Sequence, residues 1–496
     1  MSESGPRSHP RPWLRRAKRI GLGLLVSWGL LSIPALPVEL PDGAGATPFV
    51  WDRDDLWSHL ERKRDEVVAA GCQQGSASYL VALNEQLDAL EREAPGPADT
   101  RWDSLEMRLF ETAAIVAACG DGLEPLLSFR QRLRRSVKDA SAAWSDDDGG
   151  RDRLYRLLYG ARAAIEEVLL QVDASPSLAL EVDPPAPFAT PSTTIEGVVI
   201  HSGDLLLSRG GAPTSALIAR GSDHPGNFSH VALVAVDESG QARAIEAHIE
   251  RGVAVSDVDA YFADKKLRVV VLRLRADHPA LVADPMLPHR AASAALAEVR
   301  SRHIPYDFSM DFEDDAEQFC SEVASAAYRD QGVELWQHMS TFSSPGLTRW
   351  LASLGVEHFR THGPSDLEYD PQLRVVAEWH EPQTLFDDHV DNAVIDAMLE
   401  QAEAGGELHY SLPMLPIARL VKGYSVLLNL LLGAEGPIPE GMSATTGLRV
   451  QWLAAEHARI ERGVMSRMDD YRHEHGRRPP YWTLVTMARE AAVAAP

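Results

Sequence analysis

The stretch Asn227-Phe-Ser-His-Val-Ala-Leu-Val-Ala-Val236 decides how this chain folds, because it joins a histidine to an unbroken apolar run. The run from Val231 to Val236 has no polar residue, which is typical of a strand buried on both faces. Asp237-Glu-Ser-Gly240 is a turn sequence, and a returning strand is predicted after it, with Glu246 near its middle. The sequence therefore predicts a hairpin with His230 at the leading edge of one strand and Glu246 on the next.

Further strands and helices are predicted on both sides of this hairpin. Gly203-Asp-Leu-Leu-Leu-Ser208 is a turn followed by a short apolar strand, and Arg268-Val-Val-Val-Leu-Arg-Leu-Arg275 is another strand. A helix is expected over about 291–302, and a second helix begins at Cys320 and reaches about Tyr328. With helical regions at both ends of the chain, these elements predict an α+β fold.

Cys320, His230 and Glu246 are residue types with a shared chemistry. A thiolate is a stronger nucleophile than a thiol, and both a helix N-terminus and a nearby imidazolium favour the thiolate. His230 could supply that imidazolium and protonate a leaving group, while Glu246 would hold the imidazole in one tautomer. The acidic residues between 311 and 317 are then expected to point to solvent, because negative charge beside the sulfur would disfavour the thiolate.

Several short motifs along this stretch resemble those of a known protein family. They are Gly203-Asp204, Phe228-Ser229-His230-Val231, Glu246-Ala247 with Gly252-Val253, Pro305-Tyr306-Asp307 and Phe319-Cys320-Ser321-Glu322. Together they resemble the permuted papain-like amidases, the YiiX-like branch of the NlpC-type cysteine hydrolase superfamily, which is related to lecithin retinol acyltransferase. The resemblance covers about 196–360, and it includes the order of the permuted branch, in which the histidine precedes the cysteine. It implies a permuted papain-like catalytic domain over these residues.

The resemblance also implies a role for each residue of the site. Cys320 resembles the nucleophile, His230 the base and Glu246 the third polar residue. His248 and Glu250 lie close to Glu246 in sequence and are alternatives for that third role.

Tyr306 or the backbone amide of Cys320 could donate hydrogen bonds to an oxyanion. Asp204 is expected to be a turn or strand-start residue without a catalytic part. The sequence has no metal-ligand spacing, Gly-rich phosphate loop or nucleotide fingerprint, so neither a metal nor a cofactor is expected.

The first 46 residues predict export. Basic residues are concentrated between Arg7 and Arg19, and residues 20–36 form an apolar core that contains Pro34. This core is longer than many signal peptides and slightly short for a spanning helix, so cleavage near Ala44-Gly45-Ala46 and retention of residues 20–40 as a membrane anchor both stay open. In either case the body of the chain is expected outside the cytosol, in the cell envelope or periplasm.

Residues 51–174 predict an antiparallel bundle of five amphipathic helices joined by short loops. Cys72 ends the first helix and Cys119 the third, and in an up-down-up arrangement these two ends point the same way. A disulfide persists where exported proteins mature, so Cys72 and Cys119 are expected to pair and to leave Cys320 as the one free thiol of three cysteines. Two separate buried thiols are the alternative.

Two regions outside the catalytic stretch complete the chain. Residues 175–195 are rich in proline and are expected to be a linker. Residues 364–496 are mostly helical, with a strand predicted from Leu373 to Glu378. The helix from Ile417 to Leu432 is apolar nearly all round in its second half, so it is either buried or in contact with lipid. Its two basic residues favour a core helix over a transmembrane span.

The formal net charge of −24 argues against binding to a phosphate backbone, and no nucleic-acid partner is expected. The leading hypothesis is an exported cysteine hydrolase that cleaves an amide or ester bond in a cell-envelope peptide or lipid through an acyl-enzyme. An acyltransferase on lipid substrates and a non-catalytic envelope scaffold are the alternatives.

Overall fold

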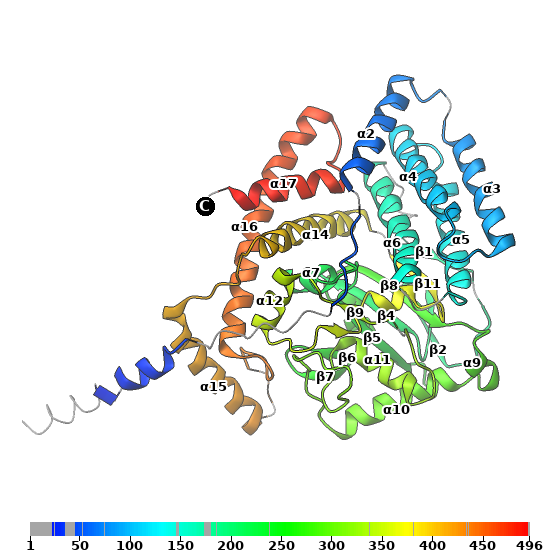
Figure 1. Cartoon of the computed structure of the whole chain (residues 1–496). Coiled ribbons are helices and arrows are strands. Elements are labelled where there is room, and N and C mark those ends of the chain that lie inside the picture. Colours follow the sequence, from blue (N-terminus) through cyan, green and yellow to red (C-terminus); the bar gives the residue numbers. More distant parts are fainter. Residues whose placement is uncertain are drawn as a thin grey trace, which may run out of the picture.

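The structure is a computed structural model, and it describes residues 22–23, 25–34, 45–51, 53–73, 75–144, 148–172, 180–184, 186–237, 239–336, 338–379, 381–432, 434 and 436–494. The predicted basic segment before residue 20 and much of the predicted linker lie outside these residues. Helices from the first part of the chain lie above a central sheet, and helices from its last part lie beside both (Figure 1). The predicted α+β class is confirmed.

The sheet has seven strands in the order β1-β11-β8-β4-β5-β6-β7, and all neighbours are antiparallel. The predicted hairpin is confirmed, since β5 begins at His230 and β6 carries Glu246. Within residues 231–236 of β5, odd-numbered side chains pack into one core and even-numbered side chains into another, so the strand is buried on both faces. The strands are β1 (Leu180–Val182), β4 (Leu205–Gly210), β5 (His230–Val236), β6 (Ala242–His248), β7 (Gly252–Asp257), β8 (Lys266–Leu274) and β11 (Leu373–Trp379).

Different elements cover the two faces of the sheet. One face is covered by α10 (Leu287–Ser301) and α11 (Cys320–Arg329), which contact β5. The other is covered by the hairpin of β2 (Ser192–Ile195) and β3 (Val198–His201) and by α8 (Val258–Ala263). The first residue of α11 is Cys320, so the packing of this helix on β5 brings the cysteine near the start of that strand.

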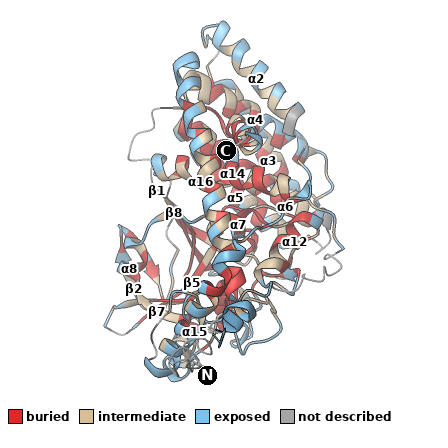
Figure 2. Cartoon of the chain, turned by 90° about the vertical axis from the view of Figure 1, so that its left-hand side faces the viewer, coloured by how far each residue is buried: buried red, intermediate tan, exposed pale blue. Residues whose placement is uncertain are grey.

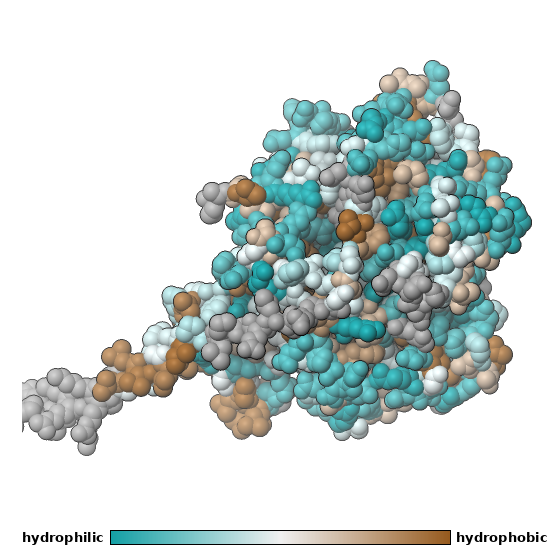
Figure 3. All heavy atoms as spheres, in the orientation of Figure 1, coloured by the Kyte–Doolittle hydropathy of each residue, from teal (hydrophilic) through white to brown (hydrophobic). Residues whose placement is uncertain are grey.

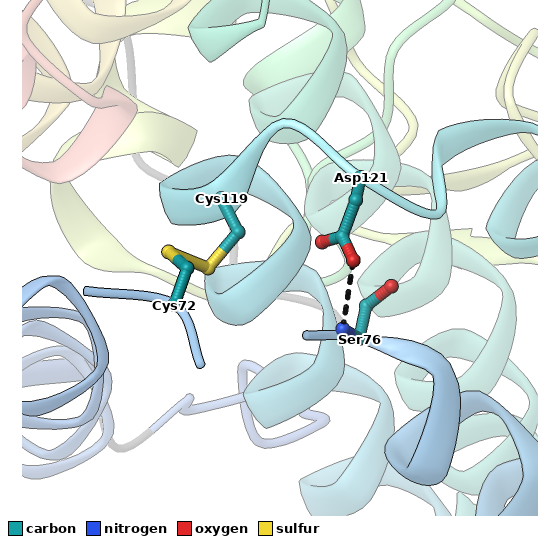
Figure 4. Close-up of a disulfide and its surroundings, with 4 residues drawn as sticks. All are labelled: Cys72, Ser76, Cys119 and Asp121. Atoms are coloured by element: carbon teal, nitrogen blue, oxygen red, sulfur yellow. Dashed lines mark hydrogen bonds between the residues drawn. A yellow bond between two sulfur atoms is a disulfide. The ribbon is translucent and has the colours of Figure 1, made fainter. Parts of the chain in front are cut away.

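The predicted five-helix bundle is also present. Leu83, Leu87 and Leu105 are fully buried at its centre. Cys72 follows the first of these helices and Cys119 ends the third, and the structure joins their sulfur atoms at one end of the bundle (Figure 4). The helices are α2 (Arg53–Ala69), α3 (Ala77–Glu93), α4 (Arg101–Cys119), α5 (Leu123–Ser141) and α6 (Asp148–Gln171).

A layer of buried ion pairs joins the bundle to the sheet. We call Arg130, Arg134, Arg162, Glu181 and Glu378 the ionic layer, and each of these residues is less than a tenth exposed. Arg130 on α5 donates to Glu181 on β1 at 2.9 Å and to Glu378 on β11 at 2.8 Å. Arg134 also contacts both carboxylates, at 2.9 and 3.3 Å, and Arg162 on α6 contacts Glu378. The bundle is therefore fixed to the sheet by charge as well as by apolar packing.

Two predicted boundaries are corrected by this arrangement. The predicted linker 175–195 contributes an edge strand, β1, because Glu181 is held by two arginines and the strand pairs with β11. The sheet also continues beyond the predicted end of the catalytic domain at residue 360, because β11 lies between β1 and β8.

The C-terminal region contains four long helices: α14 (Pro382–Glu403), α15 (Leu415–Leu432), α16 (Ala444–His475) and α17 (Tyr481–Val493). Three of them, α14, α16 and α17, pack against one another. The expectation that α15 is a core helix is wrong, since most of its apolar residues are exposed (Figure 2). Only its first turn and Ser425 are buried, because α15 leaves the body of the protein after contacting α16.

Candidate active site

His230 and Glu246 meet across the hairpin of β5 and β6. Glu246 is paired in register with Ala232, which lies two residues after His230 and so on the same face of the sheet. Its Oε2 lies 2.7 Å from Nε2 of His230. Its Oε1 accepts a hydrogen bond from Ser256 Oγ at 2.8 Å and lies 3.3 Å from Nε2 of His248. The buried carboxylate is thus held by three side chains.

Cys320 is the first residue of α11 and the free thiol of the described chain. Its sulfur lies 3.8 Å from the carbonyl oxygen of Ser229, the residue before His230, and it is close enough to His230 to raise the pKa of that imidazole. Because Nε2 of His230 is occupied by Glu246, Nδ1 is the nitrogen left for the sulfur. The first N–H groups of a helix have no partner within it, so the start of α11 adds a positive dipole end at this point.

Hydrogen bonds set the charges of the histidine and the carboxylate. Burial on its own lowers the pKa of His230, but its interactions with Cys320 and Glu246 outweigh burial and raise that pKa to about 9. Burial raises the pKa of Glu246, but hydrogen bonds from His230 and His248 outweigh it and hold that pKa well below its ordinary value. At neutral pH, His230 is therefore an imidazolium between a carboxylate and the sulfur.

Glu322 stabilises the start of α11. Its carboxyl group accepts a hydrogen bond from the backbone N–H of Phe319 at 2.8 Å, as in a capping box. Burial, followed by nearby negative charges that include Cys320, raises the pKa of Glu322 to about 9. Glu322 is therefore neutral at pH 7 and adds no negative charge beside the sulfur. Residues 313–317 of the acidic loop are exposed, in agreement with the expectation for this loop.

Tyr306 lies on a segment that is tied to the start of α11. Gln318 donates to the carbonyl of Pro305 at 3.0 Å, and Asp307 donates to the carbonyl of Gln318 at 3.3 Å. Burial, followed by the negative charge of Cys320, raises the pKa of Tyr306 well above its ordinary value. Tyr306 is therefore a protonated hydroxyl within electrostatic range of the sulfur, as an oxyanion donor would need to be.

The other residues of the motifs support the fold. Asp204 is fully buried, accepts a hydrogen bond from the N–H of His201 at 2.8 Å and binds Arg273 through both carboxylate oxygens at 2.7 Å. Gly252 has a φ of +71°, and a Cβ there would lie 2.1 Å from the carbonyl oxygen of Ile304. Glu250 is exposed, unlike Glu246, which is buried and contacts His230.

A thiol at a helix start, an imidazolium and a buried carboxylate define a cysteine hydrolase of the papain-like class. Residues 199–377 match the family described as permuted papain-like amidase enzyme, YaeF/YiiX, C92 family. The match covers this segment and not the whole chain, and it supports a cysteine amidase or peptidase-like hydrolase. The match ends at residue 377, within β11, so it also continues beyond the predicted domain end at residue 360.

The crystal structure of metalloprotein yiiX from Escherichia coli O157:H7, DUF1105, is similar over 35% of this chain and 95% of its own, with a TM-score of 0.28 and 20% identity. A search of the curated proteins gave no match. In the part of the present chain that the structure describes, no group of three or more His, Cys, Asp or Glu residues could hold a metal ion.

The structure gives a role to two residues to which the sequence assigned none, Glu322 and Ser256. Glu322 could have been found, because it lies three residues after Phe319, which is the spacing of a capping box. Ser256 could not, because its contact with Glu246 depends on the register of β6 and β7.

Proposed function

We propose that the chain is an exported cysteine hydrolase that cleaves an amide or ester bond through an acyl-enzyme on Cys320. The observation that carries the proposal is the 2.7 Å contact of His230 with Glu246 beside Cys320, whose sulfur lies 3.8 Å from the carbonyl oxygen of the residue before His230. The amidase family of residues 199–377 supports the same chemistry.

In the first half of the reaction, the thiolate of Cys320 attacks the substrate carbonyl carbon and forms a carbon–sulfur bond. The carbonyl electron pair moves to the oxygen, which would accept hydrogen bonds from Tyr306 and the backbone N–H of Cys320. The imidazolium of His230 then gives its proton to the leaving amine or alcohol, while the carbon–nitrogen or carbon–oxygen bond breaks.

In the second half, neutral His230 takes a proton from water, and the resulting hydroxide attacks the thioester. The carbon–sulfur bond breaks, and the thiolate and the imidazolium form again as the carboxylic acid leaves. Glu246 keeps Nδ1 of His230 directed at the sulfur in both halves and stabilises the imidazolium.

Export is part of the same proposal. It is supported by the basic segment between Arg7 and Arg19 with the apolar residues after it, and by the pairing of Cys72 with Cys119, a bond that persists in oxidising compartments. The expected location is the cell envelope or periplasm, where the substrate would be a peptide or lipid with an amide or ester bond.

Labelling with electrophilic acyl probes of several shapes tests the proposed function. We expect mass spectrometry to find an acyl group on Cys320 that is released in water, and no such adduct in the Cys320→Ser variant. An adduct that water leaves intact and a lipid or amine acceptor removes would identify an acyltransferase instead. Absence of an adduct with every probe would favour a non-catalytic envelope scaffold.

A further inference from the structure

The outer part of α15 is an exposed apolar surface. Residues 423–432 contain no charged side chain. Leu430, Leu431 and Leu432 are 77, 67 and 72% exposed, and Leu427 and Tyr424 are more than half exposed. Large apolar patches of this kind are unusual on the surface of a protein that is surrounded by water.

A second apolar element lies beside α15. Residues 25–31 are helical, and Leu25 and Leu30 in this segment are 71 and 62% exposed. Arg419 on α15 donates a hydrogen bond to the carbonyl of Leu31 at 2.8 Å. Figures 1 and 3 show both elements projecting from the same side of the molecule. Two segments nearly 400 positions apart in sequence thus expose apolar side chains in one place.

The charges around α15 indicate how deep it could enter an apolar phase. Lys422 donates to the carbonyls of Pro439 and Glu440 at 2.6 Å, so this basic residue is held near the body of the protein. The ten residues after Lys422 span about 15 Å as a helix. This is about half of the ~30 Å hydrocarbon core of a bilayer. The segment Leu412–Leu432 is apolar and long enough to cross a membrane, but Leu415, Pro416 and Ala418 within it are buried in the protein.

A cavity lies beneath the inner part of α15. It has a volume of about 560 Å³, and its lining includes Met414, Ile417 and Val421 of this region together with Tyr306 and Phe308 of the active-site segment. Met414 and Ile417 are also exposed at the outer surface. The cavity is therefore lined both by residues of the exposed apolar region and by Tyr306 of the active-site segment.

We propose that α15 and residues 25–31 form a bilayer-docking surface, which inserts into one leaflet and opens the cavity toward the membrane. The substrate is then a long-chain acyl amide or ester of a membrane lipid, whose acyl chain occupies the cavity. The choice of substrate rests on the proposed function, whereas docking does not. The chain carries a net charge of −24, so docking depends on apolar insertion and not on anionic lipid headgroups.

Flotation of the full chain with phosphatidylcholine vesicles tests the docking. We expect the wild-type chain to float with these uncharged vesicles at low and high salt, and the variant Leu430→Ser with Leu431→Ser to bind at least about tenfold more weakly. The matched control is Val81→Ser with Val282→Ser, which changes two residues that are 58 and 67% exposed elsewhere, and it should float like the wild type.

Two results would overturn the docking surface. One is equal flotation of the α15 variant and the wild type. The other is absence of flotation together with self-association of the wild type that the α15 variant loses, because a second copy of the chain would then be the occupant. The flotation of the α15 variant is also compared with that of the wild type when both carry Leu25→Ser and Leu30→Ser. In this background the α15 substitutions must still weaken vesicle binding.

Probe labelling separates the failure of docking from that of the proposed function. A short, water-soluble acyl probe should label Cys320 equally in the wild type and the α15 variant, since Leu430 and Leu431 lie outside the cavity lining. A long-chain acyl probe placed in the vesicles should label the variant at least about tenfold more slowly. Equal labelling by the long-chain probe would overturn the membrane substrate alone, and no labelling by the short probe in either chain would overturn the proposed function alone.

Discussion

The active site and the ionic layer both bury carboxylates against cations, but only one of them keeps a group free to react. In the ionic layer, Glu378 is contacted by the guanidinium groups of Arg130, Arg134 and Arg162. In the active site, Glu246 occupies one nitrogen of His230 and leaves the other for the sulfur of Cys320. A buried ion pair is therefore no sign of catalysis unless it directs a nucleophile. Substitutions in the site should lower turnover, and substitutions in the layer should lower stability.

The largest effect is expected from loss of the nucleophile. Cys320→Ala should lower kcat by about 10⁴-fold or more, because no other group can form the acyl-enzyme. The midpoint of its thermal unfolding should remain near that of the wild type, because the thiol is small and an alanine side chain fits the same space. Turnover of a model acyl ester and a thermal melt check both parts, and an active Cys320→Ala variant would contradict the role of the thiol.

The ionic layer should show the opposite behaviour. Glu378→Gln removes the charge that holds three buried guanidinium groups, so we expect the free energy of unfolding to fall by about 3–5 kcal/mol while turnover per folded molecule is retained. The matched control is Glu298→Gln, which breaks an exposed pair with Arg302 and should cost about 0.3–0.5 kcal/mol. Denaturant unfolding measures both. Loss of turnover without loss of stability would mean that the layer acts on the site.

The disulfide of the bundle should affect stability and leave the chemistry unchanged. Replacing Cys72 and Cys119 by Ser should lower the free energy of unfolding by about 4 kcal/mol, the chain-entropy value for a loop of this length. Peptide mapping of unreduced protein should find the two cysteines joined. Free thiols at both positions in protein purified without reductant would contradict the pairing.

A smaller effect on turnover is expected at the carboxylate. Glu246→Gln should lower kcat by about 10²-fold, because the amide still reaches His230 but no longer stabilises the imidazolium. His248→Ala should lower it by less than about tenfold, since His248 contacts Glu246 and not the sulfur. The fold should be retained in both variants by circular dichroism. The reverse ranking would move the third role to His248.

The pH dependence of stability should show the smallest effect. The contacts that raise the pKa of His230 from 6.5 to about 9 stabilise the folded chain fully below pH 6.5, and this contribution is lost as pH rises through 9. The free energy of unfolding of the wild type should therefore fall more steeply between pH 6.5 and 9 than that of His230→Ala. Parallel curves would contradict the raised pKa.

Local patterns in the sequence were sufficient where neighbours in the chain determine the structure. The apolar run after His230 predicts β5, the turn after it fixes the partner strand with Glu246, and the helix start predicts the place of Cys320. The bundle follows from its apolar spacing in the same way. These features depend on periodicity and on short-range turns, which a single sequence contains.

The sequence could not predict features that depend on distant partners. The edge strand β1 has three residues, and Glu181 within it is held by arginines about 50 positions away. The apolar character of α15 is the same for a buried and an exposed helix, so only the surrounding structure distinguishes the two. The contact of Ser256 with Glu246 likewise depends on strand register, which side-chain pattern alone does not give.

Alkylation of Cys320 tests the central claim most directly. The account predicts that iodoacetamide at pH 7 modifies Cys320 rapidly in the folded wild type, and that the rate falls at least about tenfold in His230→Ala, because the imidazolium that favours the thiolate is gone. Peptide mapping assigns the modified site. The control is Glu378→Gln, which changes the ionic layer and leaves Cys320 and His230 in place. Equal rates in the wild type and in His230→Ala would contradict a Cys320–His230 pair.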